Sequence, residues 1–151
     1  MKNKSTVDIK NKKAYYLYEI TEAYTAGIQL LGTEIKSIRQ SKISFTDSYC
    51  IFIDNELWVK GLHISEYSYA GHYNHEAKRQ RKLLLTKKEL RKLQKKIKEK
   101  GFTIIPLRIF INEKGFAKLD IGLARGKRLY DKREDLKSRD NKRDLDRFKK
   151  R

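Results

Sequence analysis

Two stretches of strict alternation constrain the fold more than any other feature of this sequence. Every second residue is aliphatic in residues 105–111 and again in residues 117–123. A period of two is typical of a strand that turns one face toward a core. The Glu113-Lys114-Gly115 segment between them predicts a short hairpin loop with glycine in the left-handed position. Pro106 lies inside the first strand, which predicts a sheet edge or a bulge there.

The remaining elements complete a mainly β fold with helices. Asp54-Asn55 predicts a second hairpin turn. Thr86 and Glu89 have the spacing of a capping box, and Gly101 is placed to end the helix that follows. About six strands with two or three helices predict a small closed OB-like antiparallel β-barrel. Besides the first hairpin, we expect strands at residues 14–20, 24–31, 48–53 and 56–62, and helices at 33–40 and 86–100.

Composition excludes several classes of protein. The 151 residues contain 37 Lys and Arg against 19 Asp and Glu, which gives a formal net charge of +18. No run of about 18 apolar residues is present, so no transmembrane helix is expected. The Lys-rich start lacks the apolar segment of a secretory signal. A single cysteine, Cys50, excludes a disulfide framework and suits a reducing compartment. We therefore expect a cytoplasmic protein.

The distribution of charge favours a nucleic-acid partner. Residues 78–100 carry 12 basic and 2 acidic side chains. A membrane-binding helix would need an aromatic face, which the apolar stripe of residues 86–100 lacks. Phosphates neutralised by such a surface release counterions, which drives binding to RNA or DNA. Some of the nine tyrosines are candidates for stacking on bases, although the sequence does not say which.

Three regions differ in composition along the chain. Residues 1–13 are polar and expected to be flexible, and residues 14–124 have the pattern of a folded domain. Residues 125–151 contain 13 basic and 6 acidic side chains but only five large apolar ones. So few apolar residues cannot offset the ordering entropy, so we expect a basic tail that is disordered when free and helical on a partner.

Signals for catalysis are weak. The segment His75-Glu76-Ala77-Lys78-Arg79 has Arg where a zinc-binding HExxH motif has its second histidine. No phosphate-binding glycine loop or nucleophile motif is present, so we expect neither an enzyme, a metal site nor a cofactor. A metal-dependent nuclease using Glu19, Glu34 and Asp47 remains the alternative from another class.

Three blocks of sequence form a specific pattern: residues 27–39 (GIQLLGTEIKSIR), residues 74–90 (NHEAKRQRKLLLTKKEL), and residues 101–140 with GLARGKRLYDKRED. In order and spacing they resemble the SsrA-binding protein (small protein B) family, the bacterial partners of tmRNA. The resemblance implies an OB-like barrel and a non-catalytic role in trans-translation, the rescue of stalled ribosomes. Members bind the tRNA-like domain of tmRNA and help aminoacylated tmRNA enter the ribosomal A site with elongation factor Tu. The tail is expected to lie in the decoding centre and the empty mRNA channel.

The resemblance also assigns site residues, and it implies a monomer. Thr86 stands where Asn or His is more usual, and Tyr130 where many relatives carry a stacking His. Glu34→Ala is expected to weaken RNA binding with little change in thermal stability. A general OB-fold RNA-binding ribosomal protein or translation factor is the alternative function. The residues expected to contact tmRNA are Glu34, Lys36, Arg79, Arg81, Lys82, Leu84 and Thr86, and those expected to contact the ribosome are Gly126, Lys127, Arg128, Tyr130, Asp131, Lys132 and Arg133.

Overall fold

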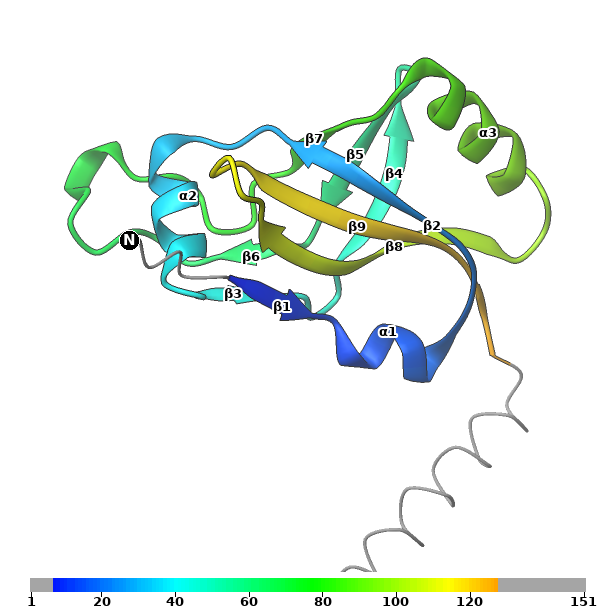
Figure 1. Ribbon diagram of the computed structural model, residues 1–151, viewed down its shortest axis with the longest axis horizontal. Coiled ribbons are helices and arrows are strands. Elements are labelled where there is room, and N and C mark those ends of the chain that lie inside the picture. The colour runs from blue at the N-terminus through cyan, green and yellow to red at the C-terminus, as the bar shows by residue number, and fades with distance from the viewer. Residues whose placement is uncertain (1–6, 128–151) are drawn as a thin grey trace, which may run out of the picture.

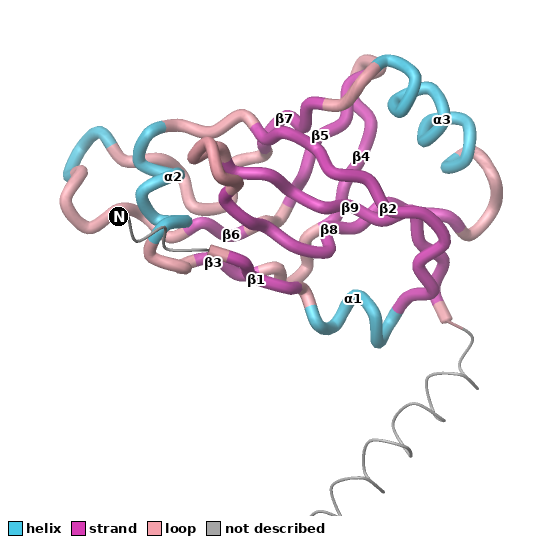
Figure 2. Tube along the Cα trace, in the orientation of Figure 1, coloured by secondary structure: helices cyan, strands magenta, loops and turns pink. Residues whose placement is uncertain are grey.

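The computed structural model describes residues 7–127, and within them six strands close into a ring (Figures 1 and 2). Neighbouring strands around the ring are hydrogen-bonded in the order β8-β4-β5-β7-β2-β9, and β9 pairs again with β8. The described pairings are all antiparallel. The ring strands are β2 (Tyr18–Ile28), β4 (Tyr49–Ile53), β5 (Glu56–Lys60), β7 (Arg81–Leu84), β8 (Phe102–Ile111) and β9 (Ala117–Gly126). The prediction of a mainly β, OB-like fold with about six strands and two or three helices is confirmed, with six strands in the ring and three α-helices in the described residues.

The predicted hairpin of β8 and β9 forms with the expected turn chemistry. Gly115 has a φ of 88°, the left-handed conformation that glycine adopts without strain. The Asn112 side-chain oxygen accepts hydrogen bonds from the backbone N–H groups of Lys114 and Phe116, at 3.1 and 2.9 Å. The expected irregularity at Pro106 is also present, because the register with β9 shifts between Pro106 and Arg108.

The β4–β5 hairpin turns at Asp54 and Asn55, as predicted. Both residues have positive φ values, 51° and 65°. Positive φ at both central residues is the type I′ geometry that matches the twist of a tight antiparallel hairpin. Two smaller strands, β3 (Ile43–Ser44) and β6 (His63–Ile64), form a separate pair.

Two helices lie where the sequence predicts them. Helix α2 (Gly32–Arg39) follows β2, and helix α3 (Lys87–Ile97) follows β7. Thr86 is the N-cap of α3, and its hydroxyl accepts a hydrogen bond from the N–H of Glu89 at 3.2 Å. Leu93 of α3 is fully buried in the core, and Leu90 and Ile97 pack against the same core.

The predicted strand at residues 14–20 is wrong over its first half. Helix α1 (Lys12–Leu17) occupies that part, and one long strand, β2, begins at Tyr18. Ala14 is buried in a small cluster with Ile105 and Leu107, and Asn11 is hydrogen-bonded to the carbonyls of Leu107 and Pro106, both at 2.8 Å. Tertiary contacts with β8 therefore select a helix where the local pattern favours a strand.

The segment expected to be flexible, residues 1–13, lies partly outside the described residues. Within its described part, β1 (Asp8–Lys10) pairs with β8 from Asp8 opposite Phe110 to Lys10 opposite Arg108. At the other end, Gly126 still pairs with Tyr18 of β2, and Lys127 N–H donates to the Leu17 carbonyl at 3.1 Å. Residues 128–151 lie outside the described part of the chain. Across residues 7–127 there is no helix of the length and apolarity needed to cross a membrane.

Candidate RNA-contacting site

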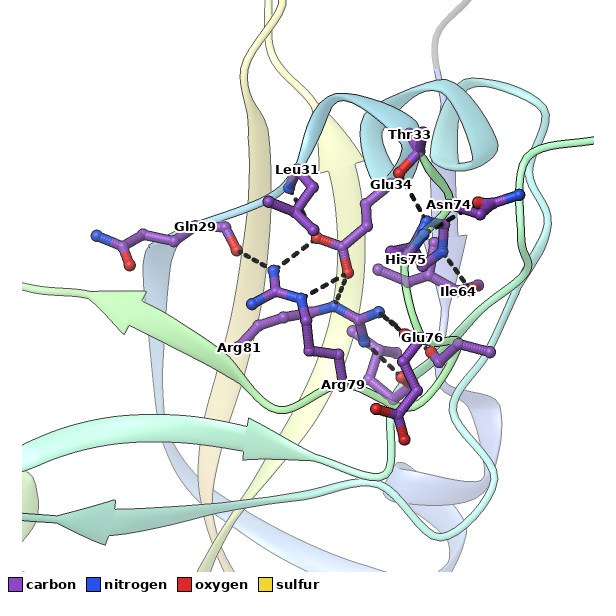
Figure 3. Close-up of polar contacts among 12 residues, drawn as sticks. Gln29, Leu31, Thr33, Glu34, Ile64, Asn74, His75, Glu76, Arg79 and Arg81 are labelled. Carbon is purple, nitrogen blue, oxygen red and sulfur yellow. Dashed lines mark hydrogen bonds and ion pairs between the residues drawn. The ribbon is translucent and has the colours of Figure 1, made fainter. Parts of the chain in front are cut away.

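Glu34 is the centre of a polar cluster at the start of α2 (Figure 3). Its carboxylate is fully buried. Oε1 accepts a hydrogen bond from the backbone N–H of Leu31 at 2.7 Å and forms an ion pair with Arg79 Nη2 at 2.6 Å. Oε2 accepts from Arg81 Nε at 2.5 Å. Both carboxylate oxygens are thus occupied by groups of this chain.

Arg81 is the buried partner in this cluster. It belongs to β7, and its side chain is fully buried although it carries a charge. Its Nη1 donates to the Leu62 carbonyl at 2.7 Å, and its Nη2 donates to the Ala77 carbonyl at 3.1 Å. A buried guanidinium is tolerated only when its charge and its donors are matched in this way. Arg81 therefore joins α2, β7 and the segment before β7.

Arg79 is the member of the cluster that reaches solvent. Its side chain is 33% exposed, whereas those of Glu34 and Arg81 are at 0%. Its Nη2 also lies 3.4 Å from the Gln29 carbonyl, so Glu34 and the end of β2 fix the guanidinium from two sides. A planar, oriented guanidinium with an open side is the arrangement suited to binding a phosphate.

Electrostatics holds Glu34 in its ionised form. Burial by itself raises the pKa of a carboxyl, because it disfavours the charged form. Here the hydrogen bonds from Arg79 and from Leu31 N–H, together with the charge of Arg81, outweigh burial and lower the pKa of Glu34 below its ordinary value of 4.5. The cluster is therefore an ionised carboxylate shared by two guanidinium groups at neutral pH.

Two residues that sequence reasoning did not single out support this cluster. The His75 ring is buried, with Nδ1 2.9 Å from the Thr33 hydroxyl and Nε2 2.8 Å from the Ile64 carbonyl. Asn74, next to it, binds the backbone of Tyr67 through both ends of its amide. His75 thereby fixes the N-terminal turn of α2, which carries Glu34, against β6. The Asn-His pair opens the block of residues 74–90 that carries the resemblance, but a role in supporting Glu34 was not predicted for either residue.

The other residues expected to contact tmRNA lie in three separate environments. Lys36 is exposed on α2, with its Nζ 5.3 Å from the centroid of the Tyr67 ring. Lys82 forms an ion pair with Glu56, and Leu84 at the end of β7 is 46% exposed. Thr86 caps α3. The structure thus brings Glu34, Arg79 and Arg81 into direct contact and places Lys36 on the same helix as Glu34.

The strongly basic helix α3 lies away from this cluster, at the opposite end of the molecule from α2 (Figure 1). Lys87, Lys88, Arg91 and Lys95 are exposed on its surface. Lys92 lies 3.6 Å from Glu22 of β2, which ties the helix to the ring. Residues 7–127 therefore present two basic areas, and of the two only the one at α2 contains a buried carboxylate.

Of the residues expected to contact the ribosome, the structure describes Gly126 and Lys127. Gly126 ends β9, and Lys127 is attached to the end of α1 through its backbone N–H. The remaining ones, Arg128, Tyr130, Asp131, Lys132 and Arg133, lie outside the described residues.

A nuclease centre is not formed by the carboxylates considered for it. Both carboxylate oxygens of Glu34 accept hydrogen bonds from Arg79 and Arg81. Glu19 lies opposite Arg125 in the β2–β9 pairing. Within residues 7–127, no three His, Cys, Asp or Glu side chains gather closely enough to hold a metal ion.

Comparison with known proteins identifies the family. The family model described as SmpB protein matches residues 8–151, which is nearly the whole chain. This chain belongs to the SmpB family. An SsrA-binding protein from Phocaeicola vulgatus is 59% identical to it over 145 residues, covering 96% of this chain and 97% of the relative. One from Bacteroides thetaiotaomicron is 57% identical over 146 residues, covering 97% of each.

A solved structure supports the same assignment. It is described as "tmRNA-SmpB: a journey to the center of the bacterial ribosome", and its matching chain has a TM-score of 0.71 and 46% sequence identity. The match covers 86% of this chain and 94% of that one. The curated relatives carry the name SsrA-binding protein, which agrees with the expectation of a binding protein rather than an enzyme.

Proposed function

We propose that this chain binds the tRNA-like domain of tmRNA and acts as a non-catalytic adaptor of trans-translation in the cytoplasm. One observation carries the proposal. Arg79 is partly exposed and oriented by the buried carboxylate of Glu34, on a chain of net charge +18 whose relatives are named SsrA-binding proteins. A guanidinium fixed in this way binds a phosphate at a defined place without first losing side-chain entropy.

The buried residues act in this proposal by positioning. Glu34 and Arg81 are inaccessible, so they hold Arg79 and the start of α2 in place and do not touch the RNA themselves. Lys36 and Arg79 are the cations that reach phosphates from this side of the molecule. Leu84 offers an exposed apolar contact at the end of β7. In this proposal Glu34 and Arg81, both expected among the residues that contact tmRNA, act on the RNA only through the residues that they position.

The finer steps belong to the same proposal. The monomeric protein, bound to aminoacylated tmRNA that elongation factor Tu carries, helps the RNA enter the A site of a stalled ribosome. The segment that follows Lys127 enters the decoding centre and senses that the mRNA channel is empty. That segment contains basic residues, which can bind rRNA phosphates, and Tyr130, whose ring can stack on a base.

Selective binding is the first test. The affinity of the full chain for the isolated tRNA-like domain of tmRNA is compared with its affinity for an elongator tRNA, at two salt concentrations. We expect a preference for the tRNA-like domain that persists at the higher salt, because purely ionic binding falls steeply with salt on every RNA. Arg79→Lys keeps the charge but loses the planar fork, and should reduce the preference. Equal affinities that fall together would overturn the proposal in favour of a general RNA-binding protein.

Truncation tests the division of labour. The cut belongs after Lys127 and not before Arg125, because Arg125 and Gly126 pair with β2. A chain ending at Lys127 should bind the tRNA-like domain as the full chain does but fail to support peptide tagging on stalled ribosomes. Loss of both activities with an unchanged melting temperature would contradict the separation.

A further inference from the structure

The segment between β6 and β7 presents unusually exposed aromatic side chains. Tyr69 and Tyr73 are 82% and 90% exposed, more than any other large hydrophobic residue in the described chain. Both belong to the loop of residues 65–78, which contains the short 3-10 helix η1 (Gly71–Tyr73). In Figure 1 this loop extends beyond α2 at the far end of the molecule from α3. The core does not account for these two rings.

The loop has a defined conformation. The Asn74 side-chain oxygen accepts from Tyr67 N–H at 2.9 Å, and its amide nitrogen donates to the Tyr67 carbonyl at 2.6 Å, so one side chain closes the loop at its base. Within it, Ala70 N–H donates to Tyr67 and Tyr73 N–H donates to Ala70, at 3.1 and 3.2 Å. Gly71 has a φ of 58°, which permits the turn. Two exposed rings are thus carried on a loop that is already ordered.

Positive charge lies on the helix beside the base of this loop. Lys36 of α2 contacts the face of Tyr67, and the Tyr67 and Tyr69 rings meet edge to face with centroids 5.5 Å apart. Lys78 and Arg79 follow on the chain, and His75 links the loop to α2. The exposed acids Glu66 and Glu76 lie on the same segment, so charge alone does not define this surface. Exposed rings next to phosphate-binding cations are the combination that binds single-stranded nucleic acid.

We propose that the loop of residues 65–78 is a stacking site for unpaired nucleotides, with Tyr69 and Tyr73 contacting bases while Lys36 and Arg79 contact the adjoining phosphates. The proposal rests on the proposed function for the identity of the RNA and adds the class of nucleotide recognised. Bases within a duplex offer no free face to a side chain, whereas bases in loops do. The site therefore selects RNA by the presence of unpaired bases.

The test compares two RNAs and four proteins. The RNAs are the tRNA-like domain of tmRNA and a fully paired RNA of similar length. The proteins are the wild type, the double variants Tyr69→Ala/Tyr73→Ala and Tyr69→Phe/Tyr73→Phe, and the control Tyr49→Ala, whose ring is 43% exposed on β4. Dissociation constants are measured over a range of salt. Melting temperatures check that each variant folds.

The alanine variant should bind the tRNA-like domain more weakly by roughly five- to 150-fold for each base that is stacked. It should bind the paired RNA as the wild type does. The phenylalanine variant and Tyr49→Ala should match the wild type on both RNAs. The slope of the logarithm of the binding constant against the logarithm of the salt concentration should be unchanged in all of these variants, because each keeps every cation proposed to bind a phosphate. Lys36→Ala removes one such cation and should make the slope shallower.

Three results would overturn the stacking proposal. They are wild-type binding by the alanine variant, equal weakening on both RNAs, and loss of binding in the phenylalanine variant. Wild-type binding by the alanine variant would indicate that the exposed rings bind a protein partner and not RNA. A wild type with no preference for the tRNA-like domain over an elongator tRNA would instead overturn the proposed function. In that case the ratio of the alanine variant's dissociation constant to that of the wild type, measured on RNA with unpaired loops, would still decide whether the tyrosines stack.

Discussion

Arg81 and Glu34 form an ion pair in which neither side chain has any exposure to solvent. The two residues are 47 positions apart, one in β7 and the other in the first turn of α2. Isolated surface ion pairs contribute little to stability, but removing one partner of a buried pair leaves an uncompensated charge. The pair therefore fixes α2 on the ring and couples the candidate RNA surface to the stability of the fold.

Glu34→Ala should destabilise the protein strongly. The guanidinium of Arg81 would remain buried without its carboxylate, a change that costs about 3–5 kcal/mol in other buried pairs. Calorimetry should record a melting temperature lower by on the order of 10 °C. This reverses the expectation, drawn from sequence, of weaker RNA binding at unchanged stability. An unchanged melting temperature would show that the pair contributes no net stability.

Stability should fall in acid because of the same carboxyl. The pKa of Glu34 is lower in the folded protein than its ordinary 4.5. Its contribution is therefore complete above about pH 4.5 and is lost as the pH falls through the folded pKa. Denaturant unfolding at pH values from 7 down to 3 should show a steeper decline for the wild type than for Glu34→Gln, which has no carboxyl to titrate. Parallel profiles would contradict this assignment.

Variants of Thr86 can distinguish a role in capping α3 from a contact with RNA. Its hydroxyl and the Glu89 carboxylate satisfy each other's backbone N–H groups at the start of α3. Thr86→Ala should lower the free energy of unfolding by about 1 kcal/mol, and Thr86→Ser, which keeps the hydroxyl, should restore it. If Thr86 serves only as a cap, both variants should bind the tRNA-like domain equally well at a temperature where both are folded. Weaker binding by the alanine variant alone would assign the hydroxyl to the RNA.

The basic face of α3 should add affinity without selectivity. Neutralising Lys87, Lys88, Arg91 and Lys95 with glutamine removes exposed charges and leaves the buried Leu93 in place. Binding should weaken on every RNA, and the salt dependence should become shallower by up to about one unit of slope for each phosphate that is no longer neutralised. Lys114→Gln, in the β8–β9 turn, is the control for a single exposed lysine. Weakening confined to the tRNA-like domain would show that α3 contributes to recognition.

Local patterns were sufficient for the hairpins and for two of the helices. The β8–β9 and β4–β5 turns depend on residues within the turn itself, and α3 depends on its own cap and stripe. The helix at residues 12–17 was missed because its conformation depends on contacts made elsewhere. Ala14 packs on Ile105 and Leu107 of β8, about 90 residues away in sequence. No window around Ala14 contains that information.

The sequence grouped three of the clustered residues as candidates but did not indicate which of them are buried. Charge and resemblance pointed to Glu34, Arg79 and Arg81 together, and all three meet. Which of them is buried depends on how β7 and α2 pack, so a charge pattern could not separate Arg81 from Arg79. The exposure of Tyr69 and Tyr73 has the same origin, because Asn74 closes the loop through contacts that composition does not record.

The closed ring has a mechanical consequence. Each of its six strands is paired on both sides, and β9 runs from the β8–β9 turn to Gly126. In Figure 1 the end of β9 lies far from α2, near the end of α1. No strand can slip by one residue without exchanging its inward and outward faces. Because every ring strand is held on both sides, the ring acts as a spacer of set length between the end of β9 and the Glu34 cluster.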